Sequence, residues 1–499
     1  MTLGLLCVNT LILLSDHQWL TDNRWLKQAV HTLEQAGDSK QGAAAAAQLA
    51  AQASSVGVIV GSSSQQALLE NQQQLNVAAL DPLMDLFQQS RRCNTSPYIQ
   101  KYRQLHSRIM SGHAPPRYLV SVAPETGMAD RLTGLVTQFY MALLSGRAMT
   151  ASHPDPDAVP PFAAACDYPL FNWTHPQLLP RAVYAPLLGQ DYATFEERRN
   201  ASMGLQQLPA PYNQQYQVFD MVNATLPMMP WLGTTNFTAW PLERPDLQHM
   251  VMASNRGATW KLANNPYHRD DFWRLGVRPE EAFMCGFWAL CRPNEQVQRL
   301  YGRDVWGPLA DPHSLKIGIQ VRFGDEVLNT DADRADDAKY LSSLMSLATP
   351  FFECAAAIES AYSVPDQQVV WYLLSDSGEF RRAAKAKYGD KLLTDTDLTA
   401  AHSSCWANRG RTTRGEVLSS GACSPELTER VMQHAVGSML ALSLADFHIM
   451  TKASGLGRVA AALSGKWNNM HELKLGDDRV CDPYTGGHPM MVALHGAGI

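Results

Sequence analysis

The chain has 499 residues, of which 45% are apolar and 18% charged, and its formal net charge is −6. This composition can bury large cores and excludes a disordered chain. The acidic balance argues against non-specific nucleic-acid binding, which depends on a basic excess. No stretch reaches the roughly 18 unbroken apolar residues of a membrane-spanning helix, which excludes a multispan membrane protein. At roughly 150 residues per domain, the length favours two or three domains.

The chain opens on an apolar segment, MTLGLLCVNTLILLS, at residues 1–15. It has about the length of a signal-peptide core, but no Lys or Arg precedes it. The end of a signal anchor, a buried helix or a strand would have the same composition. Residues 16–96 follow, and their richness in Gln and Ala favours a helical or loosely ordered stem.

Cysteines and glycosylation motifs help to indicate the cellular compartment of the protein. The nine cysteines include no C-x-x-C and no Cys pair beside a His pair, so no metal site is predicted. Cys285 with Cys291, and Cys405 with Cys423, have spacings that suit short disulfide loops; scattered buried thiols are the alternative. The N-x-S/T motif occurs slightly more often than chance predicts, although unused matches are the alternative. The five matches are at Asn94, Asn172, Asn200, Asn223 and Asn236. With the apolar N-terminus, they favour the secretory pathway.

A first α/β region begins near Pro115. Tyr118 to Val122 is a short β-rich apolar run, the turn PETGMADR follows, and apolar positions from Leu132 to Leu144 have helical spacing. Strand, tight loop and helix form the opening of a nucleotide-type α/β domain. Just before it, YRQLHSRIMSG has an amphipathic helical pattern. Residues 150–260 are rich in Pro, Asn and aromatic residues, and within them HPDPDAVPPF and LPAPY are predicted to be loops rather than linkers.

A second α/β region follows a predicted interdomain hinge at residues 300–314. Buried strands are predicted at 317–321 and 369–374, with a third in LLTDTD. The helices EFRRAAKAKYG and ELTERVMQHAVGSMLALSLAD separate strands, and FHIMTKASGLGRVAAALSG predicts strand, turn and helix. This alternation implies a second parallel sheet with right-handed crossovers. The sequence therefore predicts an α/β protein of two domains with a cleft between them.

Three polar clusters fall where predicted strands end, which is where open α/β sheets bind ligands. They are Arg322, Gly324, Asp325 and Glu326; Ser375, Asp376 and Ser377; and Ser454, Gly455, Gly457 and Arg458. An Arg offers phosphate a bidentate fork, and a Ser/Gly turn opening a helix offers it backbone N–H groups. Asp376 would bind a base edge or a ribose hydroxyl. Together the clusters predict a nucleotide-diphosphate pocket. The alternatives are a surface pair of Arg322 with Asp325 and a plain helix N-cap at Ser454.

The sequence lacks the motifs of several other classes of enzyme. The chain has no G-x-x-x-x-G-K-[ST], no G-x-S-x-G and no H-E-x-x-H. The acidic triplets at 331–333 and 395–397 do not have the form of a metal site, and no two carboxylates can be placed as the acid/base pair of a hydrolase.

Five segments in order along residues 97–470 resemble plant-type xyloglucan fucosyltransferases. They are YRQLHSRI, TGMADRLTGLVTQFYMALLSGR, EEAFMCGFWALCRPNEQV, IGIQVRFGD and LSLADFHIMTKASGLGRVAAALSGKW. Together they are similar to the wider group of fucosyltransferases that use GDP-fucose. The chain departs from plant members at Asp130, where Asn is usual, and at SGLG, where a Ser-Thr-Phe-Gly-like turn is usual.

The resemblance implies a GT-B fold of two facing Rossmann-like domains. Residues 97–310 would bind mainly the acceptor and residues 311–499 mainly the GDP-sugar. It implies an inverting transfer of fucose from GDP-fucose to a glycan or cell-wall-type polysaccharide, with no metal or other cofactor. It also implies a Golgi location, with membrane contact only through a possible N-terminal anchor. A same-fold transferase using another nucleotide sugar and a catalytically inert glycan-binding protein are the alternatives.

The resemblance also implies roles for single residues. Arg322 would hold the donor β-phosphate and stabilise the departing GDP, supported by Ser454 and Gly455. By resemblance, Asp130 lies in a loop that faces the reacting sugar. On chemical grounds, its carboxylate could accept the proton of the acceptor hydroxyl there. The other members of this loop are Gly127 and Arg131, and the other donor-side residues are Gly324, Asp325, Ser375 and Asp376.

Overall fold

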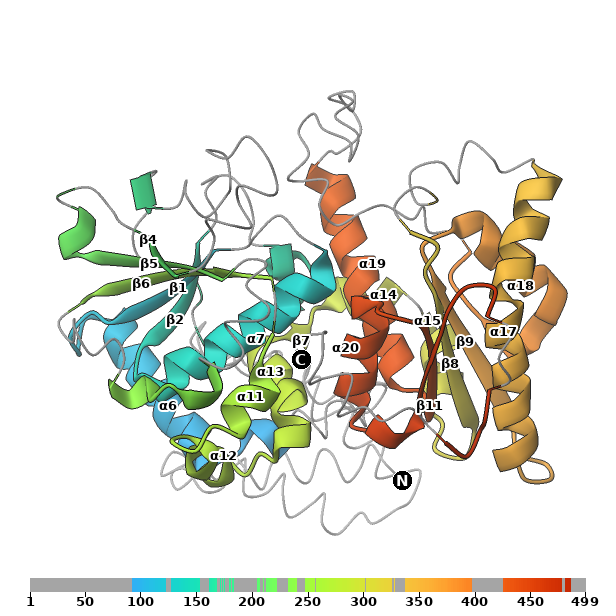
Figure 1. Cartoon of the computed structure of the whole chain (residues 1–499), viewed down its shortest axis with the longest axis horizontal. Helices are drawn as coiled ribbons and strands as arrows, with labels where there is room; N and C mark the ends of the chain where they lie inside the picture. The colour runs from blue at the N-terminus through green and yellow to red at the C-terminus, as the bar shows by residue number, and fades with distance from the viewer. Residues whose placement is uncertain are drawn as a thin grey trace, which may run out of the picture. The chain divides into compact units, whose positions relative to one another are not determined.

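The structure is a computed structural model, drawn in Figure 1 with its described residues in colour. The described residues all belong to one compact unit, Pro82–Ile499. They are 92–122, 127–152, 161–167, 204–206, 212–221, 232–239, 247–255, 257–300, 302–324, 337–396, 425–477 and 481–485, with single positions between 171 and 183, at 210 and at 327. The predicted segment 1–15 and almost all of the predicted stem lie outside the described residues.

The first sheet has the strand order β2-β1-β6-β5-β4 (Figure 1). Its strands β2, β1, β6 and β5 are parallel, and β4 is antiparallel to β5. Every residue of β1 is buried, as expected for a central parallel strand with both faces covered. The strands are β1 (Tyr118–Val122), β2 (Ala148–Ser152), β4 (Gly204–Gln206), β5 (Tyr216–Met221) and β6 (His249–Ser254).

Strands β4, β5 and β6 lie within residues 150–260, where the sequence predicted loops at HPDPDAVPPF and LPAPY and no strand. β6 is fully buried and pairs with β1 on one side and β5 on the other. Its sequence, HMVMAS, contains a single β-branched residue, so the usual composition signal of a strand is weak. The short β3 (Cys166–Asp167) also lies in this region and pairs with β7 (Arg292–Pro293).

The second sheet has the strand order β10-β9-β8-β11-β12, and all its strands are parallel. The chain passes from β8 to β9 and β10 on one side, then returns to β11 on the other side of β8. The order therefore reverses between β8 and β11, which makes this position the topological switch point. The strands are β8 (Leu315–Val321), β9 (Val369–Ser375), β10 (Leu392–Leu393), β11 (Phe447–Thr451) and β12 (Met470–Leu473). The predicted α/β class with parallel sheets is confirmed.

Helices cover both sheets. In the first half they are α6 (Pro97–Met110), α7 (Met128–Leu144), α11 (Thr259–Ala263), α12 (Arg269–Arg274), α13 (Ala282–Leu290), α14 (Glu295–Leu300) and α15 (Gly302–Ala310). In the second they are α17 (Ala338–Tyr362), α18 (Gly378–Tyr388), α19 (Pro425–Ser443) and α20 (Gly455–Ser464). Short 3₁₀ turns are Pro161–Ala164, Tyr212–Gln214, Phe237–Ala239, Pro279–Glu281, Gly389–Lys391 and Trp467–Asn469.

The predicted hinge at 300–314 is wrong, because α15 occupies most of it. Trp306 and Leu309 are only 2% and 1% exposed, and the Trp306 Nε1 donates to the Gln298 carbonyl at 2.9 Å. Gly and Pro in this segment lower its helix propensity, but burial of two large side chains outweighs that cost.

One apolar core runs from the helices of the first half into those of the second. It includes Val136 of α7, Phe287 of α13, Val436 of α19 and Leu463 of α20, all 0% exposed. A Cβ on Gly286 of α13 would lie 2.4 Å from the Val136 Cγ1, so these two helices touch through a position that only glycine fits. The two halves therefore share packed helices, and the cleft predicted between them stays a prediction.

A second core lies on the opposite face of the second sheet, under α17 and α18 (Figure 1). Among the described residues, α17 is the one helix long and apolar enough to cross a membrane. Its residues Leu344, Phe351 and Ile358 are buried in this core with strands β8 and β9, so its apolar side packs against the sheet.

The described residues contain three disulfides, Cys93–Cys285, Cys166–Cys291 and Cys354–Cys481. The short loop predicted between Cys285 and Cys291 is therefore wrong. Six helical residues separate their Cα atoms by roughly 9 Å, which is beyond the reach of a disulfide. Cys405 and Cys423 lie outside the described residues.

Candidate functional site

The site is built at the carboxyl ends of β8 and β11, where the second sheet changes direction. Thr451, the last residue of β11, accepts a hydrogen bond from the Arg322 backbone N–H at its Oγ1 (2.8 Å). The same hydroxyl donates to the Gln320 carbonyl of β8 at 3.3 Å. These two bonds hold the loops after β8 and β11 together, so the Arg322 and Ser454 clusters both lie at the switch point of the second sheet.

Asp376 shapes the loop that carries Arg322. Its Oδ1 accepts the Phe323 N–H and its Oδ2 accepts the Gly324 N–H, each at 2.9 Å. Gly324 has φ +113°, a backbone conformation that other residues rarely adopt. Burial raises the pKa of Asp376 above its ordinary value, and the two N–H donors offset part of this shift.

The sequence predicted that Asp376 binds a base edge or a ribose hydroxyl, whereas the structure shows its carboxylate bound to the backbone of the Arg322 loop. Both Asp376 oxygens are used by the protein backbone, so we assign this residue to positioning the Arg322 loop; its contact with the nucleoside stays a prediction. Ser375 is 6% exposed, and its Oγ accepts the Ser377 N–H at 3.3 Å within the same turn. Arg322 is half-buried. Asp325 and Glu326 lie outside the described residues, so the alternative pair of Arg322 with Asp325 stays untested.

Ser454 is the N-cap residue of α20, but its side chain makes no capping hydrogen bond. The residue is 5% exposed, and within the part of the chain that the structure describes its Oγ has no hydrogen-bond partner. By contrast, the Ser377 Oγ caps α18 by accepting the Phe380 N–H at 3.0 Å. The plain N-cap alternative for Ser454 is therefore not observed. A buried hydroxyl without a partner is costly, which favours a ligand that completes it.

The backbone before Ser454 is strained. Ala453 has φ 65°, in the left-handed region that costs a non-glycine residue roughly 1 kcal/mol. Strained residues cluster at functional sites because the surrounding structure must hold them in place. Here the strain is in the turn that carries the chain from β11 into the first residues of α20, so it fixes where the helix begins.

The two glycines of the SGLG turn have different surroundings. A Cβ on Gly457 would lie 2.9 Å from the Met450 Cβ and 3.0 Å from the Gln320 Oε1, so this glycine lets α20 begin against the sheet. A Cβ on Gly455 would lie 3.1 Å from the Ala129 Cβ and 3.8 Å from the Asp130 Oδ1. The first turn of α7 therefore meets the first turn of α20, and the Asp130 carboxylate lies beside the positive end of the α20 dipole.

The first turn of α7 corrects the prediction of a loop over Gly127, Asp130 and Arg131. Gly127 is the N-cap of α7, and Asp130 and Arg131 lie in its first helical turn. Asp130 is half-buried and Arg131 is 5% exposed. An acidic residue in the first turn stabilises the start of a helix. The segment PETGMADR has the composition of a turn, so the sequence did not indicate that the helix begins within it. Contact of either side chain with a sugar stays a prediction.

Arg458, the last member of the predicted Ser454 cluster, does not face the turn. Its Nε lies 2.6 Å from the Glu472 Oε1 of β12, and the residue is 9% exposed. Since a buried Arg paired with a carboxylate is a structural ion pair, Arg458 fixes α20 against β12.

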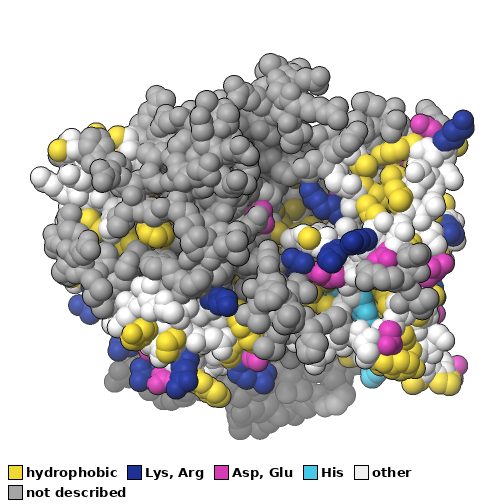
Figure 2. Space-filling model, in the orientation of Figure 1, with side chains coloured by type: hydrophobic (Ala, Val, Ile, Leu, Met, Phe, Trp, Pro, Cys, Tyr) yellow, Lys and Arg dark blue, Asp and Glu magenta, His cyan; other side chains and the backbone are white. Residues whose placement is uncertain are grey.

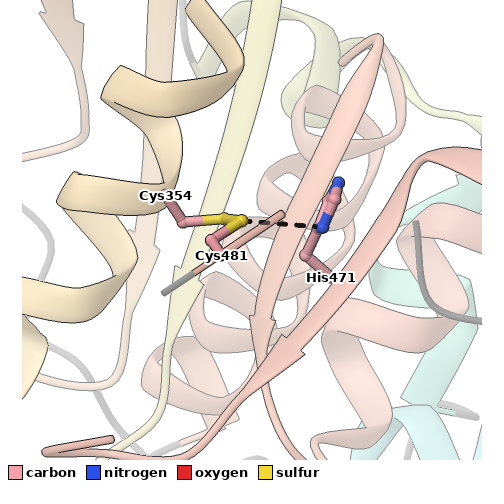
Figure 3. Close-up of side chains that lie close together, drawn as sticks. All are labelled: Cys354, His471 and Cys481. Carbon is pink, nitrogen blue, oxygen red and sulfur yellow. Dashed lines mark hydrogen bonds between the residues drawn. A yellow bond between two sulfur atoms is a disulfide. The ribbon is translucent and has the colours of Figure 1, made fainter. Parts of the chain in front are cut away.

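A cluster of metal-type ligands lies elsewhere, at Cys354, His471 and Cys481 (Figure 3). The two sulfurs are joined in a disulfide, and the Cys481 Sγ lies 3.7 Å from the His471 Nδ1. Burial lowers the pKa of His471, so the ring is neutral at pH 7. With both sulfurs bonded to each other, the cluster offers a metal ion only one nitrogen.

On the described part of the face shown in Figure 2, Lys and Arg side chains alternate with Asp and Glu. That surface has no broad basic area of the kind that a nucleic-acid backbone needs.

Comparison with known proteins gives no family assignment. No protein-family model and no curated protein matches the chain. Among solved structures, a mutant of Arabidopsis thaliana FUT1 in complex with GDP is 16% identical, with a TM-score of 0.47, over 78% of this chain and 81% of that one. The fucosyltransferase NodZ from Bradyrhizobium is 13% identical, with a TM-score of 0.33, over 70% and 92%. NodZ alpha-1,6-fucosyltransferase soaked with GDP-fucose is 15% identical, with a TM-score of 0.34. At these TM-scores the likenesses do not establish a shared activity, so an assignment depends on the chain's own residues.

Proposed function

We propose that the chain is a glycosyltransferase that transfers fucose from GDP-fucose to a glycan or cell-wall-type polysaccharide. The observation that carries the proposal is the buried Ser454 hydroxyl, which has no hydrogen-bond partner among the described residues. It lies at the start of α20, next to the loop that carries Arg322. A helix N-terminus, a hydroxyl and a guanidinium at a switch point form a recognition set for a diphosphate. The sequence resemblance identifies that diphosphate as GDP.

The diphosphate of the donor would lie against the first turn of α20. The N–H groups of that turn and the Ser454 hydroxyl donate to it, and Arg322 neutralises the charge that grows on the β-phosphate as GDP departs. Because protein donors supply this stabilisation, the proposed reaction needs no metal ion. Asp376 maintains the geometry by holding the Phe323 and Gly324 N–H groups.

Transfer with inversion is a single displacement. The acceptor hydroxyl oxygen forms a bond to the fucose C1, the bond from C1 to the phosphate oxygen breaks, and GDP leaves with the electron pair. The hydroxyl proton passes to Asp130, whose carboxylate lies beside α20. Since the sugar passes through an oxocarbenium-like state, charge and position contribute more than base strength.

We further propose a GT-B arrangement in the Golgi lumen, with residues 97–310 on the acceptor side and residues 311–499 on the donor side. The two parallel sheets and the meeting of α7 with α20 support the arrangement. The disulfides in the described residues support an oxidising compartment.

Calorimetry with GDP, GDP-fucose and UDP, with and without EDTA, tests the donor site. We expect GDP and GDP-fucose to bind regardless of EDTA and UDP not to bind. Arg322→Ala should abolish transfer while circular dichroism shows an intact fold. UDP binding would point to a same-fold transferase for another nucleotide sugar. Absence of nucleotide binding by folded protein would overturn the proposal in favour of an inert glycan-binding protein, and full activity of Arg322→Ala would overturn the donor-site assignment.

A further inference from the structure

Two of the N-x-S/T motifs lie in the described residues, at Asn94 and Asn236, and the structure treats them differently. The Asn94 Nδ2 donates to the Trp288 carbonyl at 3.2 Å, and its Oδ1 is shielded from solvent. Its neighbour Cys93 is tied to α13 by the disulfide with Cys285. A sugar on the Asn94 nitrogen would replace one of its two hydrogens and crowd the contact with Trp288, in a region closed by a covalent link.

Asn236 has the opposite environment. Its side chain is exposed, and its Oδ1 accepts the Thr238 N–H at 3.1 Å. This contact is an Asx turn, in which a side-chain carbonyl binds the backbone two residues on. Because the oxygen is used locally, the Nδ2 is the part of the carboxamide left for a reaction, and it donates to no group among the described residues. The turn also brings Thr238, the hydroxyl residue of the motif, next to the carboxamide.

The segment that carries Asn236 is anchored on both sides. Phe237 is 0% exposed, and its N–H donates to the His268 Nε2 at 2.8 Å. The Asn265 Nδ2 donates to the carbonyls of Leu232 (2.8 Å) and Thr235 (2.9 Å). The backbone is therefore held from beneath while the side chains of Asn236 and Thr238 face solvent. A glycan there would extend outward without displacing a packed group.

We propose that Asn236 is a site of N-glycosylation and that Asn94 stays unmodified. The donor is an oligosaccharide on a lipid pyrophosphate, used by the oligosaccharyltransferase of the secretory pathway. The Asn236 Nδ2 forms a bond to C1 of the oligosaccharide and loses one proton. The bond from C1 to the pyrophosphate oxygen breaks, and the lipid pyrophosphate leaves with the electron pair. The proposal rests on the lumenal location proposed above and is independent of the sugar donor.

The test is production of the full chain in eukaryotic secretory cells, with an extra acceptor motif in a C-terminal tag that reports entry into the lumen. Glycopeptide mass spectrometry should find glycan on the tag and on Asn236, and an unmodified Asn94. Asn236→Gln and Thr238→Ala should each remove the glycan from position 236 and leave every other peptide unchanged. Thr238→Ser, which keeps the hydroxyl, should retain it, and Asn94→Gln should change no glycopeptide.

A glycan on Asn94 would overturn the distinction between the two motifs. Two other results would overturn the assignment of Asn236. One is a glycosylated tag with an unmodified Asn236, which would show that the enzyme meets this motif and does not use it. The other is an unmodified tag, which would show that the chain does not enter the lumen. Calorimetry with GDP on the same preparation reports the donor site separately, so failure of the glycosylation site and failure of the proposed transferase are distinguishable.

Discussion

Asp130 and Gly455 come from helices in opposite halves of the chain, yet a Cβ on Gly455 would lie 3.8 Å from the Asp130 Oδ1. The carboxylate therefore faces the helix end that we assign to the donor diphosphate. This proximity is what the proposed reaction requires, because the base and the leaving group must act on the same sugar carbon. Addition of one methyl group at residue 455, as in Gly455→Ala, therefore tests the site.

Gly455→Ala should impair donor binding more than folding. The added Cβ lies 3.1 Å from the Ala129 Cβ, so α7 and α20 must move apart by a few tenths of an ångström. The better helix propensity of Ala, about 1 kcal/mol, offsets the cost in stability. We expect the GDP dissociation constant to rise about tenfold, which corresponds to about 1.4 kcal/mol, with little change in the thermal midpoint.

Gly457→Ala is the matched comparison. Its Cβ would lie 2.9 Å from the Met450 Cβ. Met450 belongs to β11, so relieving this contact requires a shift of the packed strand or of α20. Overpacking of this kind costs about 1–3 kcal/mol, so the thermal midpoint should fall. Equal effects of the two variants on GDP binding at equal stability would contradict the different roles assigned to these glycines.

Ser454→Ala should weaken GDP binding without destabilising the protein. The Ser454 Oγ bonds to no described group, so its removal costs no hydrogen bond seen in the structure. A hydrogen bond to a charged phosphate is worth about 1.5–3 kcal/mol, which predicts a loss of affinity of roughly 10- to 100-fold. Calorimetry gives the affinity, and a denaturation curve gives the stability.

Ser377→Ala provides the control for that variant. Its Oγ caps α18 through the Phe380 N–H, so the substitution should cost about 1 kcal/mol of stability. The GDP affinity should stay close to that of the unmodified protein. Ser454→Ala could instead destabilise the protein as much as Ser377→Ala does and leave the GDP affinity unchanged. That result would show that Ser454 is an ordinary helix cap.

Asp130→Asn should reduce turnover while donor binding is retained. Asn has nearly the same shape but cannot take the acceptor proton, and loss of a positioned base costs about 10²–10⁴-fold in rate. The dissociation constant for GDP should change by less than about threefold, because an uncharged amide still fits beside α20. Measurement of kcat with saturating donor and acceptor separates the two effects. Substantial activity in this variant would mean that Asp130 only orients the substrate.

Strands and site clusters in the second half were predictable because their signals are local. β8 and β9 are buried strands rich in Val, Ile and Leu, and each is followed by polar residues. Parallel strands present their carboxyl ends at one edge, so the sequence predicted both clusters at that edge, and the pairing of β8 with β11 makes them neighbours. β6 has only one β-branched residue, and α15 contains Gly and Pro, so burial rather than local propensity determines both.

Other features depend on side chains that meet across the fold. Asp376 has the position of a ligand-binding residue, but the nearest donors are the N–H groups of the loop after β8. The unused Oγ of Ser454 is visible only once the start of α20 is placed against the sheet. Cys285 pairs with Cys93 rather than with its near neighbour because a helix separates the closer pair. Sequence spacing carries none of this information.

Acidification should destabilise the first half of the chain through a buried pair of histidines. His249 is 3% exposed and stacks between Tyr118 and Tyr216, with ring centroids 5.2 and 4.7 Å away. His175 meets it edge-on at 5.2 Å. Burial lowers the pKa of both rings to about 4, and the charge of Arg147 adds to the shift at His249. Both rings are therefore neutral in the folded protein at pH 7.

The unfolded chain takes up these protons near the ordinary His pKa of 6.5. The free energy of unfolding therefore has its full value above pH 6.5 and decreases as the pH falls from 6.5 toward 4. Each histidine should cost about 1.4 kcal/mol of unfolding free energy per pH unit in that range. Urea denaturation at pH 7.5, 6.5 and 5.5 measures the loss. His249→Phe keeps the stack with Tyr118 and Tyr216 and removes one titrating group, so its stability should fall less steeply with pH. An unchanged slope in that variant would show that His249 does not supply the pH dependence.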